Sequence, residues 1–195
     1  MRLAVPLEVR DHVSIRAAVD TIDGELVPVD ILVNNAGVQH LRSAAEVSGN
    51  DWAYVVDTNL RGLFFCCQES GKRMVNRRGG TIVNVSSAAG VLPVKERAAY
   101  ATSKARRKHA DSRASAWVGR IRHYRQRGCS YVHSKLTLAD RPSPIRPSEP
   151  PGPNGFRLLL ATVDDVAAAV GYPVSPAAKF ITGAIVPVDG GVAMR

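Results

Sequence analysis

Apolar and polar positions follow two different periods along this chain, and the change of period predicts its elements. Four segments are nearly continuous apolar runs of strand length. The second of them is rich in β-branched residues and ends in Asn-Asn-Ala-Gly, a pattern that favours a strand buried on both faces. The four segments are "LAVPLEV" (residues 3–9), "VDILVNNAG" (29–37), "TIVNV" (81–85) and "GAIVPVDGG" (183–191).

Between these runs the apolar residues recur every three or four positions, which is typical of helices. Behind a candidate N-cap at Asp11, residues Val13, Ala17 and Ile22 lie at helical spacings and predict a first helix. Residues 51–75 predict one long amphipathic helix, residues 96–105 begin another, and residues 162–175 predict a capped helix. Six residues are expected on or near the apolar side of the long helix: Trp52, Val55, Val56, Leu60, Leu63 and Phe64.

Alternation of strands with helices predicts an α/β fold, with a parallel sheet covered by helices on both faces. A chain of 195 residues is long enough for one such domain with a substantial core. The composition, 45% hydrophobic and 22% charged, is that of an ordinary globular protein. No run approaches the roughly 20 apolar residues of a membrane span. Three cysteines without metal-ligand spacing indicate a reducing compartment, so we expect a cytoplasmic protein with no metal site.

The formal charge of +9 is concentrated in one block. Residues 105–146 contain eleven Lys or Arg and only two Asp, so this block alone carries +9. Six prolines follow one another closely between residues 142 and 153, which excludes helix and central strand there. We therefore expect residues 106–157 to form an irregular segment within a single domain, residues 1–195.

The first candidate for chemistry is the pair Tyr100 and Lys104. Four residues apart on a helix, both side chains project from one face. A lysine ammonium beside a phenol stabilises the phenolate, and such a tyrosine can exchange a proton with an alcohol or carbonyl. Tyr-x-x-x-Lys also arises by chance, so the pair needs support from its context.

That context comes from the ends of the predicted strands. Ser87 lies thirteen residues before Tyr100, just beyond the 81–85 strand, where α/β proteins present their ligands. Residues 34–37 end the preceding strand with small side chains that let a flat ligand approach the backbone. Asn59 lies in the long helix, where asparagine is a poor helix former. Taken singly, each of these could be an ordinary turn or helix residue.

Together these segments resemble the short-chain dehydrogenase/reductase family. "VDILVNNAG", "DTNLRGLFF", "GGTIVNVSS", "AAYATSKA" and "FITGAIVPVDGG" stand in the family's order and spacing, and the likeness covers roughly residues 3–105 and 162–194. The resemblance implies a Rossmann-type fold and hydride transfer between NAD or NADP and a secondary alcohol or carbonyl. It also implies a homo-oligomer for an intact relative.

The resemblance assigns roles by position. Tyr100 would be the acid/base, and Lys104 would favour its phenolate and hold the nicotinamide ribose. Ser87 would orient the substrate, and Asn59 would anchor a proton-relay water. The remaining cofactor contacts would come from Asn34, Ala36 and Gly37 at the ribose and from Glu8 and Val9 at the adenine.

Two departures from the family pattern qualify this interpretation. The chain begins at the family's third strand and contains no Gly-x-x-x-Gly-x-Gly, the turn that holds the pyrophosphate. We therefore expect an incomplete, doubly wound parallel sheet that lacks its first two strands and has an unpaired edge at residues 29–37. Because the pyrophosphate turn is absent, we also expect impaired turnover from this chain.

The second departure follows Lys104, where the apolar helical spacing gives way to the basic block. Shifting the reading frame by one base before Arg106 permits a sequence with the family's helix and strand. One hypothesis is therefore that residues 106 to about 130, and a second stretch over 142–153, are frame-displaced translation. A well-packed strand through residues 125–130 would count against it.

Three functions follow from these observations. The leading one is a dehydrogenase or reductase of secondary alcohols, with polyols, sugar acids and 3-oxoacyl groups all open as substrates. An alternative takes the basic block, with Trp117 and Tyr124 among its arginines, as a nucleic-acid-binding insert. A third is a non-catalytic partner that docks on intact relatives through the C-terminal helix and strand.

Overall fold

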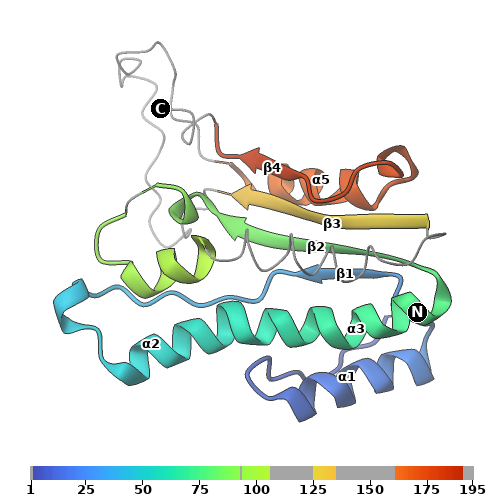
Figure 1. Ribbon diagram of the computed structural model, residues 1–195, viewed down its shortest axis with the longest axis horizontal. Coiled ribbons are helices and arrows are strands. Elements are labelled where there is room, and N and C mark those ends of the chain that lie inside the picture. The colour runs from blue at the N-terminus through green and yellow to red at the C-terminus, as the bar shows by residue number, and fades with distance from the viewer. Residues whose placement is uncertain (1, 93, 106–124, 135–160, 191–195) are drawn as a thin grey trace.

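A parallel β-sheet forms the centre of the molecule. The computed structural model of the chain describes residues 2–92, 94–105, 125–134 and 161–190 (Figure 1). Its four strands are β1 (Ile31–Asn34), β2 (Gly79–Ser87), β3 (Arg125–Ser134) and β4 (Ile185–Val188). They lie in the order β1-β2-β3-β4, and every neighbouring pair is parallel. The predicted parallel α/β architecture is thus confirmed.

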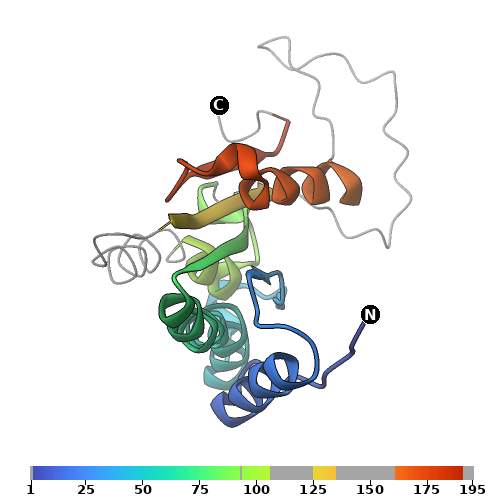
Figure 2. The same ribbon diagram turned by 90° about the vertical axis from the view of Figure 1, so that its right-hand side faces the viewer.

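Helices cover both faces of this sheet. They are α1 (His12–Glu25), α2 (Gly49–Val56), α3 (Leu63–Arg77), residues 98–105 and α5 (Val163–Val174). Figure 2 shows α3 and α5 on opposite sides of the sheet. Short 3-10 turns at Ala44–Glu46, Ala88–Gly90 and Pro176–Ala178 connect the elements. None of the described helices is both long and apolar enough to span a membrane.

Side-chain caps fix the starts of three helices. Asp11 caps α1 by accepting from the Val13 N–H, as predicted. Ser48 with Asp51, and Thr162 with Asp165, form capping boxes at α2 and α5. The predicted helix is confirmed, and its buried residues are Ile15, Ala18 and Val19, whereas Val13 is 76% exposed. A helix that packs on another helix buries only a narrow stripe of its surface. The apolar spacing alone did not show which residues form that stripe.

The predicted single long helix is interrupted. A π-helical segment, Asp57–Gly62, separates α2 from α3. The wider turn inserts a residue and rotates the buried face, so Val55 and Leu63 are buried while Trp52 and Phe64 are about half exposed. The prediction of one continuous apolar side was therefore wrong for these two aromatic residues.

The first two predicted strands also differ from expectation. Residues 3–9 form no strand, and no described segment pairs with them. A strand needs a neighbour for its backbone hydrogen bonds, and an apolar run alone does not supply one. β1 is buried on one face only, with Ile31 and Val33 exposed, so burial on both faces was wrong. Among the described residues, β1 lies at the edge of the sheet and pairs only with β2.

The irregular segment predicted over residues 106–157 is wrong at residues 125–134. There β3 pairs with β2 on one side and with β4 on the other. The stated test of the frame hypothesis was a well-packed strand, and the side-chain packing of β3 lies outside what the structure describes, so the hypothesis for residues 125–130 stays untested. The rest of the segment, with most of the basic block, lies outside the described residues.

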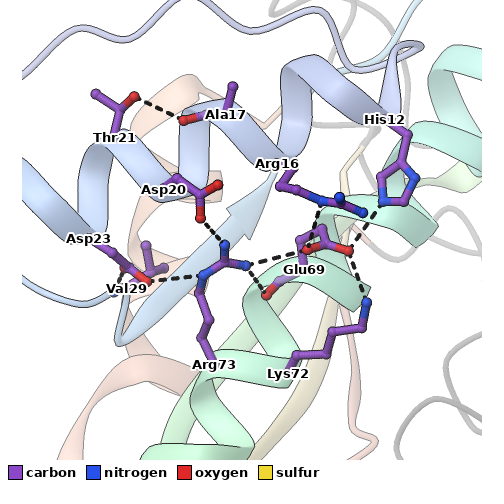
Figure 3. Close-up of polar contacts among 10 residues, drawn as sticks. All are labelled: His12, Arg16, Ala17, Asp20, Thr21, Asp23, Val29, Glu69, Lys72 and Arg73. Atoms are coloured by element: carbon purple, nitrogen blue, oxygen red, sulfur yellow. Dashed lines mark hydrogen bonds and ion pairs between the residues drawn. The ribbon is translucent and has the colours of Figure 1, made fainter.

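A cluster of charged side chains joins α1 to α3 (Figure 3). The Glu69 carboxylate, almost fully buried, lies 3.2 Å from His12 Nε2 and 3.0 Å from Lys72 Nζ. Arg73 contacts Glu69 and also reaches Asp20 and Asp23 on α1. The His12 ring stacks on Phe65 of α3. These contacts hold the two helices together on one side of the sheet.

Candidate active site

The predicted site residues gather where the strands end. In register, Asn34 at the end of β1 lies beside Asn84, and β2 continues for three more residues to Ser87. The loop that follows β1 and the turn that follows Ser87 therefore lie at the same edge of the sheet. Ligands of parallel α/β proteins bind outside this carboxyl edge.

Asn34 lies within the sheet. Its Nδ2 donates to Asn84 Oδ1 at 2.7 Å and lies 3.2 Å from Cys67 Sγ. Both asparagines are buried, so the amide pair ties the ends of β1 and β2 together. Ala36 and Gly37, the next predicted cofactor contacts, are exposed on the loop beyond.

Asn59 connects the π-helical segment to this loop. Its Oδ1 accepts the Val38 N–H at 2.8 Å, and its Nδ2 donates to the Val38 carbonyl at 2.8 Å. The side chain is fully buried, and Nδ2 also donates to Ser103 Oγ at 3.0 Å. Asn59 thus holds the loop after β1 in place. Its predicted water-binding role stays a prediction.

Tyr100 and Lys104 share the helical segment 98–105. Lys104 Nζ lies 5.5 Å from the centroid of the Tyr100 ring, so the predicted pair is brought together. Tyr100 is half-buried, whereas Lys104 is almost fully buried. Lys104 Nζ donates to the Val85 carbonyl at 3.3 Å. A buried ammonium that is held by a carbonyl and lies over the ring of a phenol is a fixed positive charge that can favour a phenolate.

The turn after Ser87 rests on the same helical segment. Ser87 is half-buried at the end of β2, and its Oγ accepts the Ala89 N–H at 3.2 Å. A Cβ on Gly90 would lie 2.8 Å from the Lys104 carbonyl carbon, so only glycine permits this approach. Ser86 Oγ donates to the Lys104 carbonyl at 3.4 Å. Ser87 is therefore carried by a turn that packs directly against the Tyr100–Lys104 helix.

Gly37, on the loop after β1, lies next to Asn59 and Lys104. A Cβ at this position would lie 3.2 Å from Asn59 Oδ1 and 3.4 Å from Lys104 Nζ. The loop backbone therefore passes within van der Waals reach of the buried ammonium. Gly37, Asn59 and Lys104, three of the predicted site residues, lie against one another.

Glu8 and Val9 lie on a turn before α1. The Arg10 guanidinium hydrogen-bonds the Glu8 carboxylate and lowers the pKa of that carboxyl to about 2. The Val9 carbonyl packs against Gly62 of the π-helical segment, where a Cβ would lie 2.4 Å from the Val9 oxygen. The two residues are thus anchored to the segment that carries Asn59.

This arrangement is suited to proton transfer. It presents a tyrosine next to a buried ammonium, with a serine on an adjoining turn. The described residues contain no group of His, Cys, Asp and Glu that could hold a metal ion. General acid–base chemistry at a substrate oxygen is what these side chains can support.

Comparison with protein families gives this chemistry a context. The family model described as short chain dehydrogenase matches residues 2–111 of the chain. The chain belongs to the short-chain dehydrogenase family. This confirms the resemblance drawn from the sequence motifs, and with it the Rossmann-like α/β fold.

Curated members of the short-chain dehydrogenase family match over most of the chain. D-threitol dehydrogenase of Mycolicibacterium smegmatis is 34% identical, over 96% of this chain and 72% of its own length. Galactitol 2-dehydrogenase (L-tagatose-forming) of Cereibacter sphaeroides is 35% identical, over 85% of this chain and 66% of its own length. The 3-oxoacyl-[acyl-carrier-protein] reductase of Staphylococcus aureus (strain Mu50 / ATCC 700699) is 28% identical, over 98% of this chain and 77% of its own length.

Sequence reasoning missed the buried residues that support this candidate site. They are Ser103, Ser86, Asn84 and Cys67, which contact Asn59, Lys104 or Asn34. Ser103 carried a weak signal, as a polar residue between Tyr100 and Lys104 on a helix. For the others, a serine or asparagine in a strand gives no indication of which partner it meets.

Proposed function

We propose that the chain transfers hydride between a nicotinamide dinucleotide, NAD or NADP, and a secondary alcohol or its ketone. The observation that carries this proposal is the buried Lys104 ammonium, which lies beside the Tyr100 ring and against Gly37. Family membership supports it, because the named relatives are dehydrogenases and reductases.

The protein side of the mechanism is a proton transfer. In the oxidation direction the Tyr100 oxygen, as phenolate, takes the proton of the substrate hydroxyl. The Lys104 ammonium, held by the Val85 carbonyl, stabilises that phenolate. Ser87 donates a hydrogen bond to the substrate oxygen and orients the carbon that loses hydride. In the reduction direction each step runs in reverse.

The residues present fit the nicotinamide end of the cofactor. Glycine at position 37 lets the loop backbone approach Asn59 Oδ1 and Lys104 Nζ closely, so a ribose bound to Lys104 would lie against this backbone without meeting a side chain there. The Lys104 ammonium can donate to ribose hydroxyls. When bound, the nicotinamide supplies the hydride acceptor or donor. Glu8, kept ionised by Arg10, and Val9 are our candidates for the adenine end.

A polyol is the substrate class that we favour. Two of the similar proteins are named for threitol and galactitol, which are polyhydroxy alcohols. A hydroxyl-rich substrate needs several hydrogen-bond partners, and the site edge offers Ser87, Tyr100 and Lys104 together. The named 3-oxoacyl reductases keep acyl ketones open as the alternative class.

The test is turnover of alditols with NAD⁺ or NADP⁺, followed by the absorbance of the reduced nicotinamide. We expect Tyr100→Phe to reduce kcat at least 100-fold, because general acid–base groups contribute about 10²–10⁴-fold. Tyr172→Phe on α5, about half exposed and distant in sequence from the site, is the matched control and should keep wild-type turnover. Equal loss in both variants, or wild-type rates in Tyr100→Phe, would contradict the proposal.

A further inference from the structure

Ser103 lies between Asn59 and Tyr100, and none of the roles assigned above involves it. Its side chain is almost completely buried, with 1% of the residue exposed. Ser103 Oγ accepts a hydrogen bond from Asn59 Nδ2 at 3.0 Å and donates one to the Tyr100 carbonyl at 2.7 Å. Both hydrogen-bonding functions of this hydroxyl are therefore used within the site.

We propose that Ser103 is a positioning residue, which locks the Tyr100 turn of the helix to the Asn59 amide and thereby to the loop after β1. The inference rests on the proposed function, since it concerns how Tyr100 is held for proton transfer. The connection runs from Val38 through Asn59 and Ser103 to the Tyr100 backbone by hydrogen bonds of 2.7–3.0 Å.

A purely local explanation accounts for only half of these contacts. Serines inside helices often donate to a carbonyl three or four residues earlier, which satisfies a buried hydroxyl without any further consequence. Ser103 also accepts from Asn59, which is 44 residues away in sequence on the π-helical segment. This second bond joins the helical segment 98–105 to the π-helical segment. Hydrogen bonds within a helix cannot make such a connection.

The consequence for the reaction is geometric. Gly37 and Val38 belong to the loop that would carry the nicotinamide ribose, and Tyr100 carries the proton. Asn59 and Ser103 join the backbones of these two groups through fully buried side chains. A buried, fully satisfied polar network fixes one arrangement of its members, because any other arrangement leaves a polar atom unpaired. Ser103 thus sets the distance between the cofactor loop and the reacting phenol.

The first test compares Ser103→Ala with Ser70→Ala. Ser70 on α3 is equally buried, and its hydroxyl has no hydrogen-bond partner among the described residues, so its removal controls for loss of a buried serine. We expect Ser103→Ala to lower kcat about 10- to 100-fold with little change in KM, because misplacement by an ångström costs about that factor. Ser70→Ala should keep wild-type kcat.

Circular dichroism of each variant gives its folded fraction, and kcat per folded molecule separates positioning from simple loss of stability. An unchanged kcat per folded molecule in Ser103→Ala would overturn the proposal.

Hydrogen exchange gives a readout that needs no turnover. The Val38 amide is held by Asn59 Oδ1, so exchange at Val38 should accelerate roughly tenfold in Ser103→Ala, the factor for one lost buried hydrogen bond. It should stay at the wild-type rate in Ser70→Ala. If Ser103→Ala shows this change but the wild-type chain oxidises no alcohol, the proposed function fails and the Ser103 link stands. Equal protection of Val38 in all three proteins overturns the link, whatever the activity.

A second pair of variants remains informative if Ser103→Ala does not fold. Ser103→Thr and Ser103→Val have nearly the same shape and differ in one hydroxyl. Higher kcat and slower Val38 exchange in the Thr variant would support the hydrogen-bond link. Equal behaviour of the two variants would show that only volume matters at this position, and would overturn it.

Discussion

Among single residues, Gly37 gives the sharpest test of the proposed cofactor site. The space that its missing side chain leaves is bordered by Asn59 Oδ1 and Lys104 Nζ. In Gly37→Ala the new methyl group would displace one of these groups by a few tenths of an ångström and would occupy the ribose position. We expect roughly tenfold weaker binding of the nicotinamide dinucleotide, about 1.4 kcal/mol, in a fluorescence titration with the reduced cofactor.

Gly24→Ala is the control for this substitution. A Cβ at Gly24, in α1, would meet nothing within 4 Å. Alanine there should leave cofactor affinity unchanged and raise the free energy of unfolding by about 0.5–1 kcal/mol, through helix propensity. Wild-type affinity in Gly37→Ala would show that the cofactor lies elsewhere.

Among the elements, the π-helical segment depends on its contact with the turn before α1. A Cβ on Gly62 would lie 2.4 Å from the Val9 carbonyl oxygen, a backbone atom that cannot rotate away. We expect Gly62→Ala to lower the free energy of unfolding by about 1–3 kcal/mol in urea denaturation, as overpacking does. Gly71→Ala on α3 has open space around its Cβ and should be neutral or stabilising. Equal midpoints for the two variants would contradict this packing.

The charged cluster between α1 and α3 makes their packing sensitive to acid. Burial of Glu69 raises its pKa, but hydrogen bonds from Lys72 and His12 outweigh burial and lower the pKa to about 2 from 4.5. A carboxyl with a lowered pKa in the folded state contributes stability above its unfolded pKa. That contribution disappears as the pH falls through the folded value. The difference corresponds to about 3 kcal/mol, which should be lost between about pH 5 and pH 2.

Glu69→Gln tests this assignment. The variant should be destabilised by about 3 kcal/mol at pH 7, because it lacks the ionised carboxylate that His12, Lys72 and Arg73 contact. Its free energy of unfolding should change less than that of the wild type between pH 5 and pH 2. Glu25→Gln, on the exposed end of α1 and in no described ion pair, should follow the wild-type curve. Parallel curves for Glu69→Gln and wild type would show that another carboxyl governs the acid response.

The sequence predicted the positions of helices and strands better than it predicted the contacts between them. Capping residues are local, so the starts of α1 and α5 were predicted correctly, and continuous apolar runs predicted β1, β2 and β4. The π-helical segment was missed because it depends on Gly62 meeting Val9, which lies more than fifty residues earlier. β3 was missed because its residues are polar and basic, and pairing with β2 and β4 overrides that composition.

In the site, motifs identified Tyr100 and Lys104, but not the Ser103 contact that joins them to Asn59.

For the whole molecule, the exposed edge of the sheet is the feature that bears on behaviour in solution. Within the described residues, β1 pairs on one side only, and Ile31 and Val33 are exposed on the same face. Unpaired backbone groups beside exposed apolar side chains are a template for strand pairing between molecules. This edge lies next to the Asn34–Asn84 pair, so association through it would also reach the strand ends that carry the site.

A single lysine on this edge should reduce self-association. Val33→Lys places a charge on the edge strand, where pairing with a second copy would bury it, and edge lysines are the usual protection of natural sheets. We expect sedimentation velocity to show a smaller associated fraction at each protein concentration, with unchanged circular dichroism. Val163→Lys adds the same charge at the 70%-exposed start of α5, away from any strand edge, and should associate like the wild type. If both lysines reduce association equally, net charge is the cause, and the β1 edge plays no part.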